Sequence, residues 1–299
     1  MINKIFWRAG QEITPDTFIQ ADNHSCSQYN LIRRLIAGAY YGLLPQEATG
    51  ALSYTVKANL NNRVLHMEQI TCYGTTAAGY LIQFDHNRST ALPNLQLPLP
   101  PADADAFYVV LRVDPYVQVL IEPVENEEAP EAHSAYELDI KEISQIAADE
   151  LAILKINNLD GTPVVDADYI PPCSSVYACA KMRSVFEAVK TLFAEIHSSL
   201  LQNQNRYANL MYPLTLIHHE MDECSPHASP GVLVGIIKKF IITCQFFIPN
   251  IRQIIQIETI EAYCHNDAAI IFNVLLSSLH EIKHMVSTVE ITEAFTPEI

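Results

Sequence analysis

The stretch "DADYIPPCSSVYACAKMRSVFEAV", residues 166–189, joins two parts of the chain that have different patterns. Before it, short apolar runs alternate with turn residues, which is typical of β-strands. After it, apolar residues recur at spacings of three and four, which is typical of helices. Pro171 and Pro172 fix φ at about −65° and disfavour helical backbone at each preceding residue, so a strand cannot run on into the helix. This predicts a domain boundary after Pro172, with domains over 1–172 and 173–299.

The first domain is predicted to hold an N-terminal helix followed by an antiparallel β-sandwich. Thr14 can cap the helix, Pro15 suits its first turn, and Gly42 with Pro45 is expected to end it. Its apolar stripe comprises Phe18, Ala21, Tyr29, Ile32, Leu35, Ile36 and Ala39. Strands are expected over 51–60, 63–73, 79–84, 106–113, 117–124, 135–140 and 151–159, with Asp114-Pro115 separating two of them. The predicted class is α+β.

The second domain is predicted to be a helical bundle. Helices are expected over about 180–213, ended by Pro213, and over 230–247, 250–264 and 267–290. The most apolar of them contains Lys238 and Lys239, which would each cost roughly 2.5–3.5 kcal/mol at a bilayer centre, so it is expected to be buried in protein. A seam with alternating spacing lies on the first helix and could be the core of one bundle or a contact between chains: Met182, Val185, Val189, Leu192 and Ile196.

Charge and cysteine usage bear on partners and location. The chain has 34 acidic and 18 basic residues and a formal net charge of −16. A field of this sign repels nucleic-acid phosphates and anionic lipids, so neither nucleic acid nor direct membrane insertion is expected. The seven scattered cysteines include no Cys-x-x-Cys pair, and the N-terminus does not resemble a secretory signal. These features indicate a cytoplasmic protein.

The segment "HEIKH", residues 280–284, suggests an alternative function. On a helix His280 and His284 lie on one face, and with Glu281 as base this is the spacing of zinc-dependent hydrolases. Glu290 falls where one class of these enzymes places a third ligand. That class needs a glycine three residues after the second histidine to break the helix, and Ser287 stands there instead. We therefore expect the helix to continue and no metal or cofactor to be bound, and we keep a zinc-dependent hydrolase as the alternative.

Two further groups are given structural interpretations. The possible metal ligands within 218–227 are expected to form an exposed loop between helices, because adjacent residues seldom bind one ion together. Tyr40, Tyr41, Phe246 and Phe247 fall on apolar faces, where core packing is expected. Because no set of catalytic residues stands out, the chain is not expected to be an enzyme.

Two motifs resemble those of a known family: "FWRAGQEITPDTFIQADN", residues 6–23, and "YIPPC", residues 169–173. The first resembles the opening pattern of the TssK family of type VI secretion baseplate subunits, and the second is similar to that family's junction between β shell and helical bundle. The matching residues are Trp7, Gly10, Pro15, Phe18 and Asp22 in the first motif and Tyr169, Ile170, Pro171 and Pro172 in the second. We expect them to serve an interface or the domain junction.

The resemblance implies an adaptor that forms a homotrimer. TssK-like proteins have a β-sandwich similar to the shoulder domain of phage receptor-binding proteins. Its end holds the TssF and TssG wedge proteins, and an additional C-terminal domain contacts the membrane complex. This sequence is expected to be a short form whose bundle surface, 218–230 loops or acidic tail takes over that contact, with the protein cytoplasmic and docked at the inner membrane through partners. A phage-tail or other contractile-injection adaptor is a weaker alternative.

Overall fold

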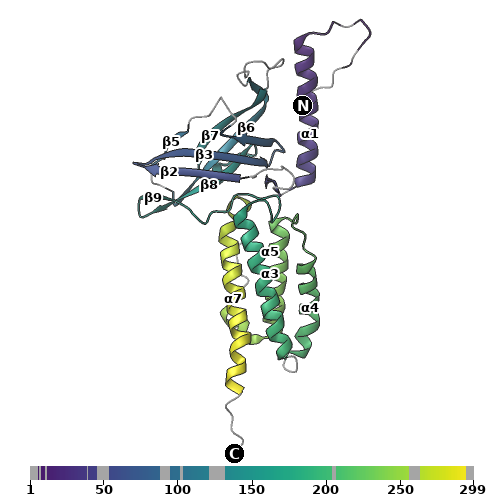
Figure 1. Cartoon of the computed structure of the whole chain (residues 1–299), viewed down its shortest axis with the longest axis vertical. Helices are drawn as coiled ribbons and strands as arrows, with labels where there is room; N and C mark the ends of the chain where they lie inside the picture. The colour runs from purple at the N-terminus through teal and green to yellow at the C-terminus, as the bar shows by residue number, and fades with distance from the viewer. Residues whose placement is uncertain are drawn as a thin grey trace, which may run out of the picture. The chain divides into compact units, whose positions relative to one another are not determined.

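The computed structural model describes residues 6, 8–10, 12–38, 40–45, 54–87, 95–101, 104–120, 132–203, 207–255 and 263–293. It contains two compact units, Met1–Pro172 and Cys173–Ile299. The first holds antiparallel sheets and the second holds helices (Figure 1), so the predicted α+β class is confirmed. Of the predicted motif residues, Trp7 lies outside the described part of the chain.

The first unit contains helix α1 and two antiparallel sheets. Helix α1 spans Pro15–Ala37. One sheet has β3 at its centre, paired with β1, β2, β4 and β5, and the other has the order β7-β6-β8-β9. The strands are β1 (Gly42–Leu43), β2 (Tyr54–Asn61), β3 (Val64–Thr75), β4 (Leu81–Asp85), β5 (Gln96–Pro98), β6 (Ala106–Leu120), β7 (Ala132–Lys141), β8 (Glu150–Leu159) and β9 (Thr162–Val165).

The two sheets pack face to face through apolar side chains. Alternation along β3 buries every second residue over much of its length, as period-2 geometry requires for one buried face. The Phe84 ring lies edge-on to Tyr136 of the other sheet, with ring centroids 5.1 Å apart. The Tyr54 hydroxyl donates to the Ile153 carbonyl across the same interface at 2.6 Å. The predicted antiparallel sandwich is therefore present.

Two expected boundaries in this unit are wrong. Strand β6 continues through Asp114-Pro115, because the pairing with β7 shifts register between Asp114 and Gln118. Pro115 lies in this irregular stretch, where its missing N–H breaks no ladder bond. Helix α1 ends at Ala37, where Gly38 adopts a positive φ of 55°, and Gly42 instead begins β1.

The Tyr-Ile-Pro-Pro segment is buried within the first unit. Tyr169 is 2% exposed, and its ring lies edge-on to Tyr108 at 5.8 Å. Its hydroxyl donates to the Ala152 carbonyl at 3.4 Å. The Pro172 carbonyl accepts from the N–H of Leu43 at 2.8 Å, so the segment is also held through its backbone.

In the part of the second unit that the structure describes, four long α-helices and one short one form a bundle. These are α3 (Ala180–Gln202), α4 (Ala208–Asp222), α5 (Pro230–Phe247), α6 (Pro249–Ile254) and α7 (Ala268–Glu293). The four long helices run side by side (Figure 1), with α3 against α4 and α7, and α5 against α4 and α7. In the core the rings of Phe193 and Phe240 contact each other with centroids 4.2 Å apart and planes tilted by 34°. This ring of neighbours lets each helix bury its apolar stripe in one core.

Helix boundaries in the bundle depart from expectation at two places. The predicted helix over 180–213 is two helices, and Pro213 lies inside α4 instead of ending it. In the expected helix over 250–264, α6 ends at Ile254, and residues 256–262 lie outside the described part of the chain.

The seam predicted on α3 is buried inside a single chain. Met182, Val189 and Ile196 are fully buried and Leu192 is 4% exposed, while Val185 is only partly buried. Phe186, Phe193 and Leu200 complete the buried stripe. The three–four spacing is thus satisfied by packing within the bundle and supplies no argument for contact between chains.

Helix α5 is the one described helix whose length and composition would allow it to cross a membrane. Its buried side contributes Leu233, Ile237, Phe240, Ile241 and Cys244 to the bundle core, as expected for a core helix. Lys239 lies on its exposed side and forms an ion pair with Glu220 of α4.

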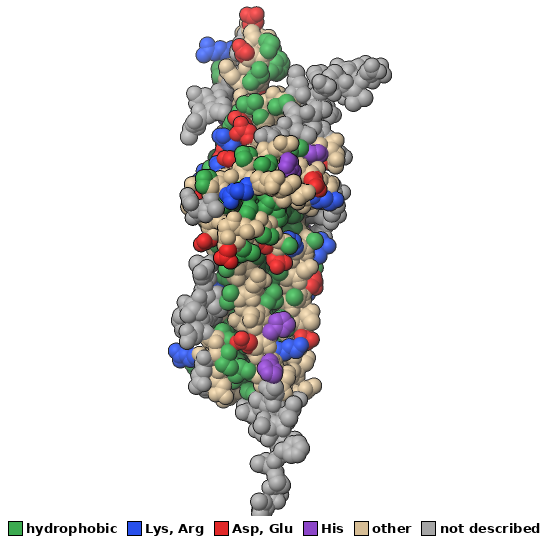
Figure 2. All heavy atoms as spheres, turned by 90° about the vertical axis from the view of Figure 1, so that its left-hand side faces the viewer, with side chains coloured by type: hydrophobic (Ala, Val, Ile, Leu, Met, Phe, Trp, Pro, Cys, Tyr) green, Lys and Arg blue, Asp and Glu red, His purple; other side chains and the backbone are tan. Residues whose placement is uncertain are grey.

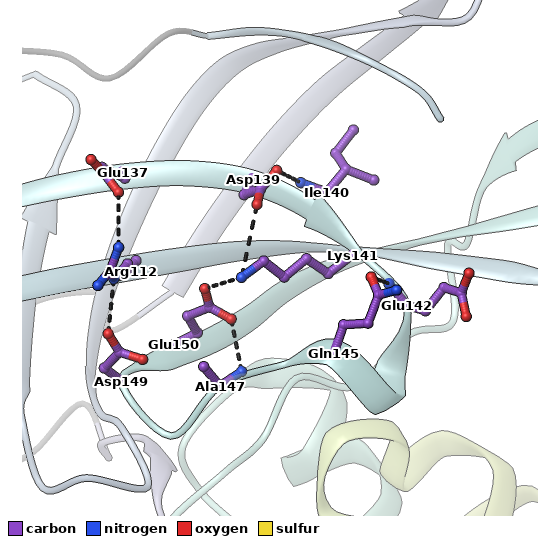
Figure 3. Close-up of polar contacts among 10 residues, drawn as sticks. All are labelled: Arg112, Glu137, Asp139, Ile140, Lys141, Glu142, Gln145, Ala147, Asp149 and Glu150. Carbon is purple, nitrogen blue, oxygen red and sulfur yellow. Dashed lines mark hydrogen bonds and ion pairs between the residues drawn. The ribbon is translucent and has the colours of Figure 1, made fainter. Parts of the chain in front are cut away.

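Three strands of the second sheet carry a polar network (Figure 3). Glu150 is only 3% exposed, and its carboxylate contacts the Lys141 ammonium and accepts from the Ala147 N–H at 2.8 Å. Asp139 lies 3.8 Å from the same ammonium. A neighbouring pair, Arg112 with Asp149, is 2.8 Å long and more exposed on the arginine side.

Replacing Lys141 with Met is expected to destabilise the first unit by about 3 kcal/mol, because it leaves the buried Glu150 carboxylate without its cation. The matched variant Arg112→Met removes an exposed cation and should cost ~1 kcal/mol or less. Chemical denaturation of both variants measures the difference. Equal losses would show that Lys141 contributes no more than a surface pair.

Candidate functional site

Helix α1 carries the residues of the first predicted motif, and its start is well defined by the sequence. The Thr14 hydroxyl accepts from the Thr17 N–H at 3.4 Å, and the Thr17 hydroxyl accepts from the Thr14 N–H at 3.0 Å. Pro15 stands at the first helical position, as predicted. Gly10 has a φ of 79°, a conformation that favours glycine, in the turn before the helix.

The side of α1 that faces its own sheets is polar. Asn30 is 4% exposed, and its side chain accepts from Arg33 at 3.0 Å. Gly79, in the turn before β4, approaches the backbone of α1 so closely that an added Cβ would lie 2.2 Å from the Asn30 carbonyl oxygen. At the border between this side and the exposed side of the helix, the Gln118 amide of β6 donates to the Asp22 carboxylate at 3.4 Å.

The opposite side of α1 is apolar and exposed. We call Phe18, Tyr29, Ile32, Leu35 and Ile36 the outer face of α1; their exposed fractions run from 50% for Ile32 to 81% for Ile36. Phe18, Asp22, Ser25, Tyr29, Ile32 and Ile36 follow one another at alternating steps of four and three residues. This spacing places them on one stripe of the helix, as in the seam of a coiled coil.

A cleft of about 370 Å³ adjoins this stripe. Its lining combines α1 with β6 and comprises Phe18, Ile19, Asp22, Asn23, Tyr116 and Gln118. Two residues of the first motif, Phe18 and Asp22, therefore share one surface feature. Because the cleft has an apolar wall beside a carboxylate and an amide, it suits a side chain or loop of a protein better than a charged small molecule.

An exposed apolar surface of this extent has a physical meaning. Contiguous exposed apolar patches are small on monomeric proteins, and larger ones mark protein or membrane contacts. The outer face runs along the C-terminal half of α1 with Phe18 near its start, and each member is at least half exposed. Such an arrangement can contribute binding energy to a contact with another macromolecule.

Gly79→Ala is expected to loosen α1 from the sheets, because the methyl group would overlap the helix backbone and φ at this position is +86°. We expect a loss of about 2–4 kcal/mol in stability of the first unit. Gly161 is the matched control: it has a similar φ of +81° with nothing near an added Cβ, so Gly161→Ala measures the backbone strain alone, about 1 kcal/mol. Thermal unfolding compares them, and equal losses would mean that the close approach to α1 adds nothing.

The zinc-hydrolase alternative receives no support from the geometry. As predicted, α7 continues through Ser287 without a break. The backbone of residue 290 is therefore about 15 Å from that of His280 along the helix axis. His280, Glu281 and His284 are exposed on α7. Among the described residues, no group of three or more His, Cys, Asp or Glu side chains is placed to hold a metal ion.

The expected loop at 218–227 is only partly a loop. Residues 218–222 form the last turn of α4, where His218 and His219 contact carboxylates four residues later at 3.6 and 3.2 Å. The His218 ring stacks on His197 of α3 with centroids 4.7 Å apart. Burial and then the neighbouring His218 lower the pKa of His197. This pair belongs to the packing of α3 against α4.

Sequence reasoning placed some aromatic residues wrongly. Phe246 is 80% exposed, and Tyr40 and Phe247 are each 37% exposed, although core packing was expected. Apolar periodicity identifies a face that avoids water, but it does not say whether the partner lies in the same chain. The outer face of α1 was likewise visible only as a helical stripe.

Comparisons with known proteins bear on the fold. No protein-family model and no curated protein matches the sequence. A crystal structure of TssK matches 95% of this chain and 69% of that chain, with 14% sequence identity and a TM-score of 0.64. A chain of the type VI secretion TssK-TssF-TssG baseplate subcomplex matches over 95% of this chain and 99% of that chain, with 16% identity and a TM-score of 0.59. The structure of TssK from EAEC in complex with a nanobody matches over 89% of this chain and 68% of that chain, with 14% identity and a TM-score of 0.57. The predicted resemblance is therefore confirmed at the level of the fold: both units together have the fold of TssK.

Proposed function

We propose that this chain is a structural subunit of a type VI secretion baseplate and not an enzyme. The observation that carries the proposal is the likeness to TssK across both units in order, over 95% of the chain. A helix that exposes a long apolar face beside a cleft supports it, because an assembly subunit needs such surfaces.

The outer face of α1 is proposed to dock on a second copy of the same chain. Four of its members, Phe18, Tyr29, Ile32 and Ile36, lie with Asp22 and Ser25 on the stripe of alternating four and three steps. Such a stripe suits a helix packed against an identical helix, since equivalent residues then meet along it. Burying the exposed half of one of these five side chains contributes about 1 kcal/mol of binding free energy. Each copy contributes five such side chains. This gain is of the order needed to offset the entropy of association, and a third copy would add to it. A homotrimer is the proposed state.

The partners proposed beyond self-association are TssF-like and TssG-like wedge proteins and a component of the membrane complex. The support is the match to a chain of a type VI secretion TssK-TssF-TssG baseplate subcomplex. Such an adaptor would act in the cytoplasm at the inner membrane. On the face drawn in Figure 2, the acidic and basic side chains of the described residues are interspersed.

Co-expression with the TssF-like and TssG-like proteins of the same genome tests the proposal. The full chain should co-elute with both in size-exclusion chromatography and remain with them in moderate salt. The Gln20→Asp variant, which changes an exposed position away from the outer face, should co-elute equally. Failure of the wild-type chain to bind either wedge protein, while those two bind each other, would contradict the proposal.

A further inference from the structure

Two of the scattered cysteines meet at the start of the helical unit. The sulfur atoms of Cys173 and Cys179 lie 3.8 Å apart, in contact but not bonded. Cys173 is the first residue after the double proline, and Cys179 stands at the N-cap position of α3 without a side-chain capping hydrogen bond. The five residues between them include Val176, whose N–H donates to the Ala228 carbonyl at 2.8 Å. The loop therefore holds the two thiols together.

The surroundings favour a thiolate at Cys179. The hydrogen bond between the two thiols is the largest influence that lowers the pKa of Cys179. The backbone N–H groups of Lys181 and Met182, in the open first turn of α3, act in the same direction, as does the Lys181 charge. Burial opposes them. The same contact and burial raise the pKa of Cys173, so the pair divides into a nucleophile and a proton donor.

The other buried cysteines lack these features. Burial alone raises the pKa of Cys72 and of Cys244 to about 12, and both are fully buried. Cys179 is 8% exposed and Cys173 is 1% exposed. Reactivity of a thiol follows its thiolate fraction and access, so Cys179 is distinguished from the other buried cysteines on both counts.

We propose that Cys173 and Cys179 form a redox-active dithiol that a peroxide converts into a disulfide. The Cys179 thiolate attacks one peroxide oxygen: an S–O bond forms, the O–O bond breaks, and the leaving oxygen takes up a proton. The Cys173 sulfur then attacks the resulting sulfenic acid. An S–S bond forms, the S–O bond breaks, and the departing hydroxide takes the Cys173 proton to leave as water. With hydrogen peroxide, two thiols are oxidised, one peroxide is reduced, and two waters form.

Bond formation requires only a small movement. A disulfide has its sulfur atoms about 2.05 Å apart, so the two must approach by somewhat under 2 Å. This is within the reach of side-chain rotation at Cys179, which stands outside the regular helix. The product closes a short ring over the first turn of α3, and reduction by a dithiol such as dithiothreitol restores the two thiols.

The test treats the reduced full-length protein with hydrogen peroxide, blocks remaining thiols with N-ethylmaleimide, and maps peptides by mass spectrometry. We expect a Cys173–Cys179 disulfide, a loss of two hydrogen atoms, and full reversal by dithiothreitol, while Cys72 and Cys244 stay reduced. In Cys173→Ser, dimedone should trap a sulfenic acid at Cys179. The rate at which dimedone traps Cys179 should fall about tenfold for each pH unit below the pKa of Cys179, because only the thiolate reacts with peroxide.

Variants keep the proposal separable from misfolding. Cys179→Ser retains a good helix N-cap, so its circular dichroism should match the wild type while Cys173 no longer oxidises. Cys264→Ser removes an exposed thiol that could compete and should leave the disulfide yield unchanged. The proposal is overturned if both cysteines stay reduced under peroxide that oxidises Cys264, or if either pairs mainly with a different cysteine.

Discussion

Val189→Asp should unfold the helical unit. Val189 is fully buried on α3 at the centre of the stripe that packs against the neighbouring helices. Burying a carboxylate there costs about 4 kcal/mol or more, a large part of the roughly 5–15 kcal/mol that stabilises a domain. Far-UV circular dichroism should show a loss of helix at ambient temperature.

The neighbouring position provides the control for that substitution. Ala188 is exposed on the same helix, so Ala188→Asp adds the same charge outside the core. Its effect on stability should lie within about 0.5–1 kcal/mol. If Val189→Asp melts at the temperature of Ala188→Asp, α3 does not bury this stripe in the bundle.

Ile32→Asp should abolish self-association while leaving the chain folded. Ile32 is half exposed in the single chain, so an aspartate there remains hydrated and costs little in the monomer. In the proposed helix contact it would be buried near its counterpart from another copy, where like charges repel. The mass measured by light scattering should fall from three times the 33.5 kDa chain mass to the monomer mass.

Gln20→Asp is the matched control, because it places the same charge on an exposed position of α1 away from the outer face. It should keep the wild-type mass. If Ile32→Asp keeps the oligomer but loses the wedge proteins, the outer face binds a wedge protein instead, and the self-docking proposal is wrong.

Much of the fold could be predicted because local rules and tertiary packing agree. Proline geometry marked the change from strand to helix at Pro171 and Pro172, and apolar runs bounded by turn residues predicted most of the sandwich strands. Thr14 and Pro15 located the start of α1 because capping is a local interaction. The prediction that the last helix continues through Ser287 is correct for the same reason, because no helix-breaking glycine stands there.

The errors arise where a distant partner decides the outcome. Pro115 is tolerated in β6 because the pairing with β7 shifts there, which no local pattern reveals. Pro213 lies within α4, and the chain instead leaves the helix after Gln202. The strands β1, β5 and β9 are two to four residues long, too short for a periodic signal. Their pairing with longer strands creates them.

The candidate site was the least predictable part. The stripe on α1 predicted a helix, and the usual assumption buries such a stripe in the same chain. Here the polar side, with Asn30, faces the sheets, and Gly79 allows the close approach. Likewise, Cys173 and Cys179 have no spacing that signals a pair, and a loop held by Val176 brings them together. Such features depend on three-dimensional placement.

Affinity purification of the tagged full-length chain from its native cells, followed by mass spectrometry, tests the baseplate role most directly. A structural baseplate subunit should bring down TssF-like and TssG-like proteins in fixed stoichiometry, and Ile32→Asp should lower their recovery together with self-association. Recovery of phage-tail proteins in their place, or of no secretion component at all, would contradict the baseplate assignment.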